Sequence, residues 1–299
     1  GSAGRGGGPI QATLRSQPPG SVNGKIRITD QGEVIQQKYG YEPLAKYNLC
    51  SYIGAVVQAS LKPPPEPKNK WKDLIEKMSK ISTESYRENI NNKLDFIRYF
   101  KTVTPHKALG KLSIGSRPSK RKNVDNIKSL RAIPWVFAWT QIRLFLPAWL
   151  GTTEALKHSS RMKFMNTLID MEKNWPFFNS TMDMLDMVIT KIDPEISKVY
   201  EDKLADKKLK LVGEKLRSQF NDLKKLNKKI TPKEILKQRK IFRSSVIIRN
   251  IYSEVLHIVQ AIVMKKISTQ RLSTKQKKYL NDSLMTSIAG ISAAMKNTG

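Results

Sequence analysis

Hydrophobic side chains recur at helical spacing along most of the chain. Residues 42–61 are mostly apolar and predict a helix that ends before the three prolines at 63–65. Residues 71–81 predict an amphipathic helix, because three apolar side chains fall on one face: Leu74, Ile75 and Met78. The first half of the chain therefore already contains long helical segments.

Beyond residue 140 almost every segment predicts a helix. The lysine-rich stretch 203–240 carries one apolar stripe, with the lysines on the opposite, solvated side. Residues 245–265 are apolar almost all round, so we expect that helix to be buried. Ser273 and Gln276 have capping-box spacing and predict the start of a last helix. The stripe in 203–240 and the apolar face of the last helix are Leu209, Val212, Leu216, Phe220 and Leu223, and Leu280, Leu284, Ile288, Ile291 and Met295.

Two segments favour strands. Lys25–Thr29 alternates polar and apolar residues, and Ile133–Trp139 is an apolar run that predicts a buried strand. The stretch 104–128, rich in Gly, Pro, Lys and Ser, precedes that run, and a loop of this length is usually functional or disordered. A few strands followed by many helices indicate a mainly α fold that is not a complete α/β barrel by itself.

The net charge of +29 invites a nucleic-acid-binding interpretation. However, 39 of the 54 basic residues are lysines, and they are spread along the whole chain rather than along one stripe. A solvated basic surface is therefore the better interpretation, and a basic helical nucleic-acid-binding protein is kept as the alternative.

Other function classes find little support in the residues. The single cysteine, Cys50, excludes an internal disulfide framework and a cysteine-based zinc cluster, and the three histidines lack metal-ligand spacing. The longest apolar run, Ala132–Trp139, is too short to cross a membrane, and the Gly-rich start does not match a signal peptide. We therefore expect a cytoplasmic chain with no membrane segment.

Several basic residues are candidates for binding anions. Arg5 lies in the glycine block Gly4–Gly8, where backbone N–H groups can approach an anion. The loop Gly115–Lys122 leads to Arg131 at the start of the apolar run, which suits phosphate or carboxylate capture. The alternatives are a flexible tail and a solvated basic loop.

Two further cations lie on apolar helices. Arg249 is placed among Ile248, Ile251 and Val255, where a charge needs either an acidic partner or an anionic ligand. Lys191 ends another apolar helix and could equally extend into water. No nucleophile–base arrangement or pair of carboxylates accompanies these cations.

Short motifs are spread along the whole chain. They are Gly4-Arg5-Gly6-Gly7-Gly8, Ser16-Gln17-Pro18-Pro19, Gln31-Gly32-Glu33-Val34-Ile35, Gly115-Ser116-Arg117-Pro118, the string from Ser129 to Gln141, Leu146-Pro147-Ala148-Trp149-Leu150-Gly151, Trp175-Pro176-Phe177-Phe178, Arg249-Asn250-Ile251-Tyr252 and Asn297-Thr298-Gly299. In this order, these motifs resemble the phosphoenolpyruvate carboxylase family.

The resemblance implies the C-terminal third of an enzyme of the bacterial type, starting inside its glycine-rich loop. Residues 1–152 would be the C-terminal part of a (β/α)8-type barrel, and residues 153–299 a helical region carrying an effector site. The family's reaction forms oxaloacetate and phosphate from phosphoenolpyruvate and bicarbonate with Mg²⁺ or Mn²⁺. The metal ligands and the catalytic histidine would lie upstream, so we expect this chain alone to be inactive, with exposed apolar surface.

The resemblance also implies roles for individual residues. Arg131 would bind the substrate phosphate, Arg5 and Arg117 would belong to the catalytic site, and Lys120, Arg121 and Lys122 would form a mobile loop over it. An inhibitor, aspartate or malate, would be held by four residues: Arg5, Lys191, Arg249 and Asn297. The full-length enzyme would be a cytoplasmic homotetramer without a specific nucleic-acid or membrane partner.

Overall fold

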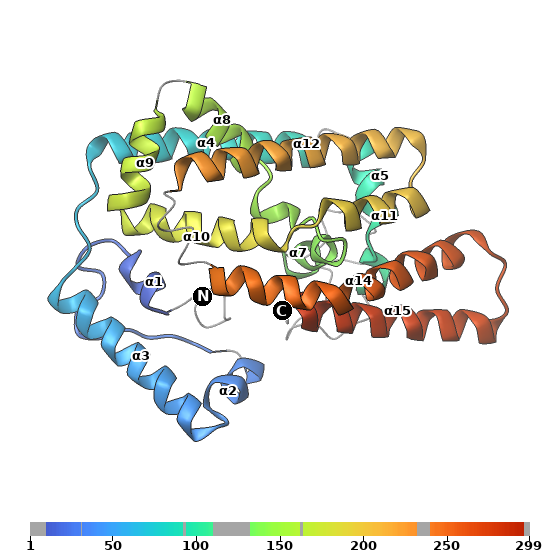
Figure 1. Ribbon diagram of the computed structural model, residues 1–299, viewed down its shortest axis with the longest axis horizontal. Helices are drawn as coiled ribbons and strands as arrows, with labels where there is room; N and C mark the ends of the chain where they lie inside the picture. Colours follow the sequence, from blue (N-terminus) through green and yellow to red (C-terminus); the bar gives the residue numbers. More distant parts are fainter. Residues whose placement is uncertain are drawn as a thin grey trace. The chain divides into compact units, whose positions relative to one another are not determined.

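The computed structural model in Figure 1 describes residues 10–30, 32–91, 94–109, 132–161, 164–231 and 240–295. Within these ranges every regular element is a helix. The helices are α1 (Ile10–Arg15), α2 (Gly32–Tyr39), α3 (Glu42–Leu61), α4 (Asn69–Asn91), α5 (Leu94–Val103), α6 (His106–Leu109), α7 (Ala132–Gln141), η3 (Leu146–Ala148), α8 (Thr152–Arg161), α9 (Met165–Asn174), α10 (Pro176–Lys191), α11 (Pro194–Leu204), α12 (Lys207–Ile230), α14 (Lys240–Thr269) and α15 (Thr274–Met295).

The chain forms two compact units, each assembled from separate stretches of sequence. Unit 1 comprises 1–77, 159–186 and 227–233, and unit 2 comprises 78–158, 187–226 and 234–299. Both units are therefore discontinuous in sequence.

Unit 1 is organised around α3, against which α1 and α2 pack. A small core forms where Leu14 and Val22 meet Ala55 and Ala59 of α3. Elsewhere in this unit Trp71 stacks on Trp175 with ring centroids 5.8 Å apart. Much of α3 is nevertheless exposed, including Leu61 at 83%.

Unit 2 has a larger, aromatic core. Phe100 of α5 lies 4.8 Å from Trp135 and 5.3 Å from Trp139 between ring centroids, and both tryptophans belong to α7. Trp139 is fully buried, and Phe96 contacts it from α5 with ring centroids 5.6 Å apart. Burial of several aromatic rings makes α7 a central element of this unit.

The last two long helices, α14 and α15, run side by side as an antiparallel pair in unit 2 (Figure 1). The capping box at the start of α15 is confirmed. The Ser273 N–H donates to Gln276 Oε1 at 3.0 Å, and the Gln276 N–H donates to Ser273 Oγ at 3.2 Å. Leu284, Ile288 and Ile291 are buried as expected.

The two strand predictions are wrong. Residues 25–29 have no regular structure, and Ile133–Trp139 belongs to helix α7. A short apolar run does not distinguish a buried strand from a buried helix by its pattern alone. Pro134 lies in the first turn of α7, where proline costs no helical hydrogen bond. The mainly α prediction is confirmed, and no strand occurs in the residues that the structure describes.

The expectation that residues 245–265 are buried is also wrong in part. One face of α14 is exposed, with Ile248 at 64% and Ile251 at 74%. The buried face carries Ser253, His257 and Gln260. Val246, Ala261 and Val263 are buried as well, so apolar residues lie on both the inner and the outer face of α14.

Among the described residues, one helical stretch, Val246–Thr269, is long and apolar enough to cross a membrane, although 33% of its most apolar window is buried. The sequence analysis overlooked this stretch. It is weak evidence for a membrane span, because core helices of soluble proteins have the same length and composition.

Candidate functional site

The structure describes two of the predicted site residues, Lys191 and Arg249. The others lie outside the described residues: Arg5, Arg117, Lys120, Arg121, Lys122, Arg131 and Asn297. The predicted catalytic residues and mobile loop are therefore not tested by the geometry. The site that can be built from atoms is the one around Lys191 and Arg249.

Lys191 is the last residue of α10 and is half-buried. Its ammonium Nζ lies 6.0 Å from the centre of the Phe145 ring. Its backbone carbonyl accepts a hydrogen bond from Nε of Arg143 at 2.7 Å. Lys191 is thus contacted at both its main chain and its side-chain end by the segment that follows α7.

Arg249 lies on α14 and is half-buried. Its Nη1 donates to the carbonyl oxygen of Ala294 at 3.0 Å. Ala294 belongs to the last turn of α15, three residues before Asn297. Arg249 therefore lies beside the chain segment that leads into a third predicted residue of the same site.

Arg143 contacts Lys191 and interacts electrostatically with Arg249, and it was not among the residues expected from the sequence. Its side chain is fully buried, and Nη1 and Nη2 have no hydrogen-bond partner among the described residues. Burial lowers the pKa of Arg143, Asp193 and Glu254 oppose that shift, and the nearby charge of Arg249 adds to it. The sequence did contain one signal, a lone arginine inside the apolar run 142–150, because a buried charge is costly unless it is paired or hydrogen-bonded.

The turn that carries Arg143 has an uncommon backbone. Arg143 has φ +58° and Phe145 has φ +47°, both in the left-handed region that side chains other than glycine rarely adopt. The Arg143 carbonyl accepts from the Asp193 N–H at 3.0 Å, which ties the turn to the start of α11. Such conformations cost roughly 1–3 kcal/mol each and are common at functional sites.

A buried polar network lies along the inner face of α14. The Tyr200 hydroxyl donates to Gln260 Oε1 at 2.7 Å and lies 3.1 Å from Nδ1 of His257. Gln260 Nε2 donates to Gln141 Oε1 at 3.0 Å, which joins α14 to the end of α7. Burial, assisted by the charge of Arg143, lowers the pKa of His257 to about 3, so this histidine is neutral at pH 7.

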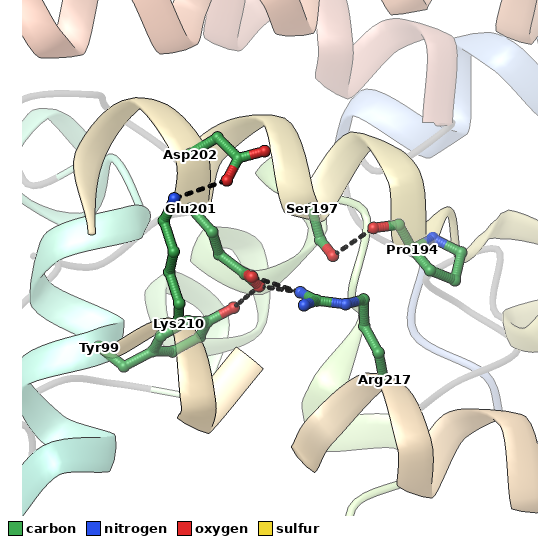
Figure 2. Close-up of polar contacts among 7 residues, drawn as sticks. All are labelled: Tyr99, Pro194, Ser197, Glu201, Asp202, Lys210 and Arg217. Atoms are coloured by element: carbon green, nitrogen blue, oxygen red, sulfur yellow. Dashed lines mark hydrogen bonds and ion pairs between the residues drawn. The ribbon is translucent and has the colours of Figure 1, made fainter. Parts of the chain in front are cut away.

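A second group of buried charges holds α5, α11 and α12 together in unit 2 (Figure 2). Glu201 is buried, and its Oε1 accepts a hydrogen bond from the Tyr99 hydroxyl at 2.7 Å. Glu201 also forms an ion pair with Arg217. Burial, with the Glu201 charge, raises the pKa of Tyr99 well above its usual value. A Cβ on Gly213 would strike the Glu201 carboxylate, so this position suits only glycine. The partners satisfy one another, which indicates a structural role.

The part of the chain that the structure describes contains no group of three or more His, Cys, Asp or Glu side chains that could hold a metal ion. The described residues therefore offer no fit for the Mg²⁺ or Mn²⁺ that the family resemblance implies. The site near Lys191 contains the cations Lys191, Arg143 and Arg249, and cationic side chains of this kind suit an anionic ligand.

Comparison with known proteins gives this site its context. The family model described as phosphoenolpyruvate carboxylase matches residues 1–299. The chain is 42% identical over 300 residues to the phosphoenolpyruvate carboxylase of Hahella chejuensis and 44% identical over 300 residues to that of Shewanella halifaxensis. The corresponding protein of Marinobacter nauticus is 42% identical over 301 residues.

Each of these matches covers 100% of this chain but only 34% of the relative. The chain thus spans about a third of the length of the curated relatives it matches. Nothing in these comparisons supports the nucleic-acid-binding alternative. A family match over every residue, together with identity above 40% in several relatives, shows that the chain belongs to the phosphoenolpyruvate carboxylase family.

Proposed function

We propose that this chain forms the C-terminal third of an enzyme that makes oxaloacetate and phosphate from phosphoenolpyruvate and bicarbonate. The observation that carries the proposal is the unbroken family match over residues 1–299. In this proposal residues 1–152 supply the C-terminal part of a barrel, and residues 153–299 form the helical region with the effector site. The working enzyme is a cytoplasmic homotetramer.

The reaction explains why the candidate residues are cationic. Bicarbonate attacks the phosphorus of phosphoenolpyruvate, which breaks the bond to the enol oxygen and gives carboxyphosphate and the pyruvate enolate. Carboxyphosphate releases phosphate and CO₂, and the enolate carbon then attacks CO₂ to form oxaloacetate. Every intermediate except CO₂ is anionic, so fixed positive charge stabilises the reacting groups.

In this proposal Arg131 binds the substrate phosphate and Arg5 and Arg117 lie in the catalytic site. Lys120, Arg121 and Lys122 belong to a loop that covers the site and keeps water away from carboxyphosphate. A divalent metal, Mg²⁺ or Mn²⁺, neutralises substrate charge when bound, and the proposal assigns it to no residue of this chain.

The same proposal includes a regulatory site for aspartate or malate at Arg5, Lys191, Arg249 and Asn297. Two contacts support it. Arg143 donates to the Lys191 carbonyl, and the charge of Arg249 lowers the pKa of Arg143, so both predicted residues act on one buried guanidinium. Arg249 also contacts the last turn of α15, close in sequence to Asn297.

The activity is tested with a chimaera in which this chain replaces the last third of the Hahella chejuensis relative. We expect oxaloacetate formation that requires both phosphoenolpyruvate and bicarbonate, whereas the 299-residue chain alone should release no phosphate. A chimaera that has the far-ultraviolet circular dichroism and oligomeric state of the parent but forms no oxaloacetate would contradict the proposal.

Arg131→Ala in the active chimaera should reduce kcat/KM strongly, because a charge-assisted hydrogen bond contributes about 1.5–3 kcal/mol and more in a closed site. Exposed Arg87 offers a matched control, and Arg87→Ala should leave the rate unchanged. Near-normal kinetics for Arg131→Ala would show that this arginine is structural.

The regulatory part is tested separately. Lys191→Ala and Arg249→Ala should weaken inhibition by aspartate or malate while leaving most of the uninhibited rate, whereas Arg5→Ala should reduce both. The measurement is the rate against inhibitor concentration at fixed phosphoenolpyruvate. If Lys191→Ala and Arg249→Ala are both inhibited normally, these two residues do not form the effector site.

A further inference from the structure

The segment Arg143–Phe145 has features that the proposed function leaves unexplained. It combines a fully buried guanidinium with two left-handed residues, Arg143 and Phe145, within three positions. Backbone strain of this kind persists only where the surroundings hold it in place. A simple connection between α7 and η3 would need neither feature.

The contacts of this turn converge on one residue, Lys191. Arg143 Nε donates to the Lys191 carbonyl at 2.7 Å. Lys191 is the last residue of α10, where carbonyl groups lack a partner within the helix, so Arg143 satisfies one of them. The Phe145 ring lies under the Lys191 ammonium, with Nζ 6.0 Å from the ring centre. That distance lies at the outer limit of a cation–π contact.

The main-chain bonds make the turn rigid on the side facing α11. The Arg143 N–H donates to the Thr140 carbonyl at 3.1 Å, and the Arg143 carbonyl accepts from the Asp193 N–H at 3.0 Å. Asp193 in turn caps α11 through bonds from Glu195 N and Ile196 N, both at 3.1 Å. The turn, the end of α10 and the start of α11 therefore form one hydrogen-bonded unit around Lys191.

We infer that Arg143 and Phe145 are positioning residues for the ammonium of Lys191 in a dicarboxylate-binding site. Without the aromatic face and the backbone anchor, a lysine at a helix end extends into water and samples many rotamers. With them, its charge is held over the Phe145 ring, and its backbone is anchored by Arg143. The inference rests on the proposed effector site and adds the residues that shape it.

The electrostatics favour an anion at this place. The Arg143 guanidinium has two nitrogen atoms without partners among the described residues, and Arg249 adds like charge nearby. Asp193 and Glu254 compensate part of this charge. A dicarboxylate bound by Lys191 and Arg249 would reduce the remaining repulsion, since opposite charge stabilises a buried cation.

The test uses the complete 299-residue chain and the affinity for aspartate and for malate, measured by titration calorimetry. Phe145→Leu removes the ring with little change in volume, and we expect about threefold to tenfold weaker binding. Phe145→Tyr keeps the ring face and should bind within about twofold of the unchanged chain. Phe220→Leu removes another buried ring of unit 2 and serves as the control, with unchanged affinity.

A double-mutant cycle separates positioning from a general structural effect. Phe145→Leu should weaken binding in the unchanged chain but add nothing in the Lys191→Ala background, because the ring acts through that lysine. Arg143→Met should weaken binding by a larger factor than Phe145→Leu, and Arg143→Lys should recover part of the loss. Phe145→Leu and Phe145→Tyr test the positioning role even if the Arg143 variants do not fold.

The outcomes separate the positioning role of Phe145 from the existence of the effector site at Lys191. Normal affinity of Phe145→Leu, combined with lost binding in Lys191→Ala, would overturn the positioning role and leave the effector site standing. Normal affinity of Lys191→Ala would overturn both. Absence of aspartate and malate binding at millimolar concentration to the folded, unchanged chain would also overturn both.

Discussion

Two long helices of unit 2, α12 and α14, distribute their apolar residues differently. On α12 the apolar stripe is the buried face, with Leu216 at 3% and Leu223 at 0% exposure, and its lysines face water. On α14 the buried face mixes polar with apolar residues, and the outer face carries isoleucine and valine side chains. Only α12 follows the usual arrangement of a surface helix.

The difference teaches what an apolar composition does and does not specify. The period of α12 assigns its inner face correctly, because only one face is apolar. The composition of α14 predicts burial all round, yet its inner face also carries His257 and Gln260 in a hydrogen-bonded network. The exposed isoleucine and valine side chains of α14 form an apolar surface that the described residues leave uncovered.

The largest expected effect is on the inner face of α12. Phe220 is 2% exposed and lies 5.9 Å from Trp149 between ring centroids. Phe220→Ala should lower the free energy of unfolding by about 3–5 kcal/mol through lost burial and the cavity left behind. Urea titration monitored by tryptophan fluorescence measures this change, and a loss below about 1 kcal/mol would contradict the assigned face.

The next effect concerns the polar network on the inner face of α14 and its dependence on pH. His257 has a pKa of about 3 in the folded chain, against about 6.5 when unfolded. Because the unfolded chain binds the extra proton, the stabilising contribution is complete above pH 6.5 and is lost as the pH falls towards 3. The slope attributable to this group is at most about 1.4 kcal/mol per pH unit.

That slope is measured by urea titrations between pH 7 and pH 5. His257→Asn should flatten the dependence, whereas His158→Asn, a change at an exposed histidine, should not alter it. An unchanged slope in the His257 variant would mean that the ring is already protonated or accessible in the folded chain.

The smallest effect on stability is expected on the outer face of α14. Ile251 is 74% exposed, so Ile251→Ser should change the free energy of unfolding by no more than about 0.5 kcal/mol. The same substitution should reduce binding of a hydrophobic dye and slow aggregation of the 299-residue chain. A loss of more than about 2 kcal/mol would show that this face is buried in the isolated chain.

Much of the helical architecture could be predicted from the sequence. The apolar composition of 42–61 identified α3, the apolar spacing identified α12, α15 and the part of α4 over 71–81, and the capping box gave the start of α15 within a residue. Local signals of this kind are reliable because hydrogen bonding and apolar spacing are both determined by nearby residues. The run Ile133–Trp139 was misassigned because all-round apolarity removes the period that distinguishes helix from strand.

The candidate site was only partly within reach of sequence reasoning. Lys191 and Arg249 were identified through the family resemblance; Arg143 donates to the Lys191 carbonyl, and the charge of Arg249 lowers the pKa of Arg143. Arg143 was missed because its importance comes from burial, a left-handed backbone and a contact across 48 residues. None of these properties leaves a local pattern, since each depends on tertiary structure.

The discontinuous sequence of unit 2 has a consequence for how the chain is made. The side-chain amide of Gln141 donates a hydrogen bond to the Ser292 hydroxyl, which lies 151 residues later in the sequence. At about 5–20 residues per second, a ribosome needs on the order of ten to thirty seconds to supply that partner. Until then α7 and α11 present unpaired polar groups beside a half-formed aromatic core, and loop closure over this separation slows the final docking. The native arrangement of unit 2 is therefore expected only after α15 has left the ribosome, so the aromatic core of the nascent chain stays incompletely covered throughout that interval.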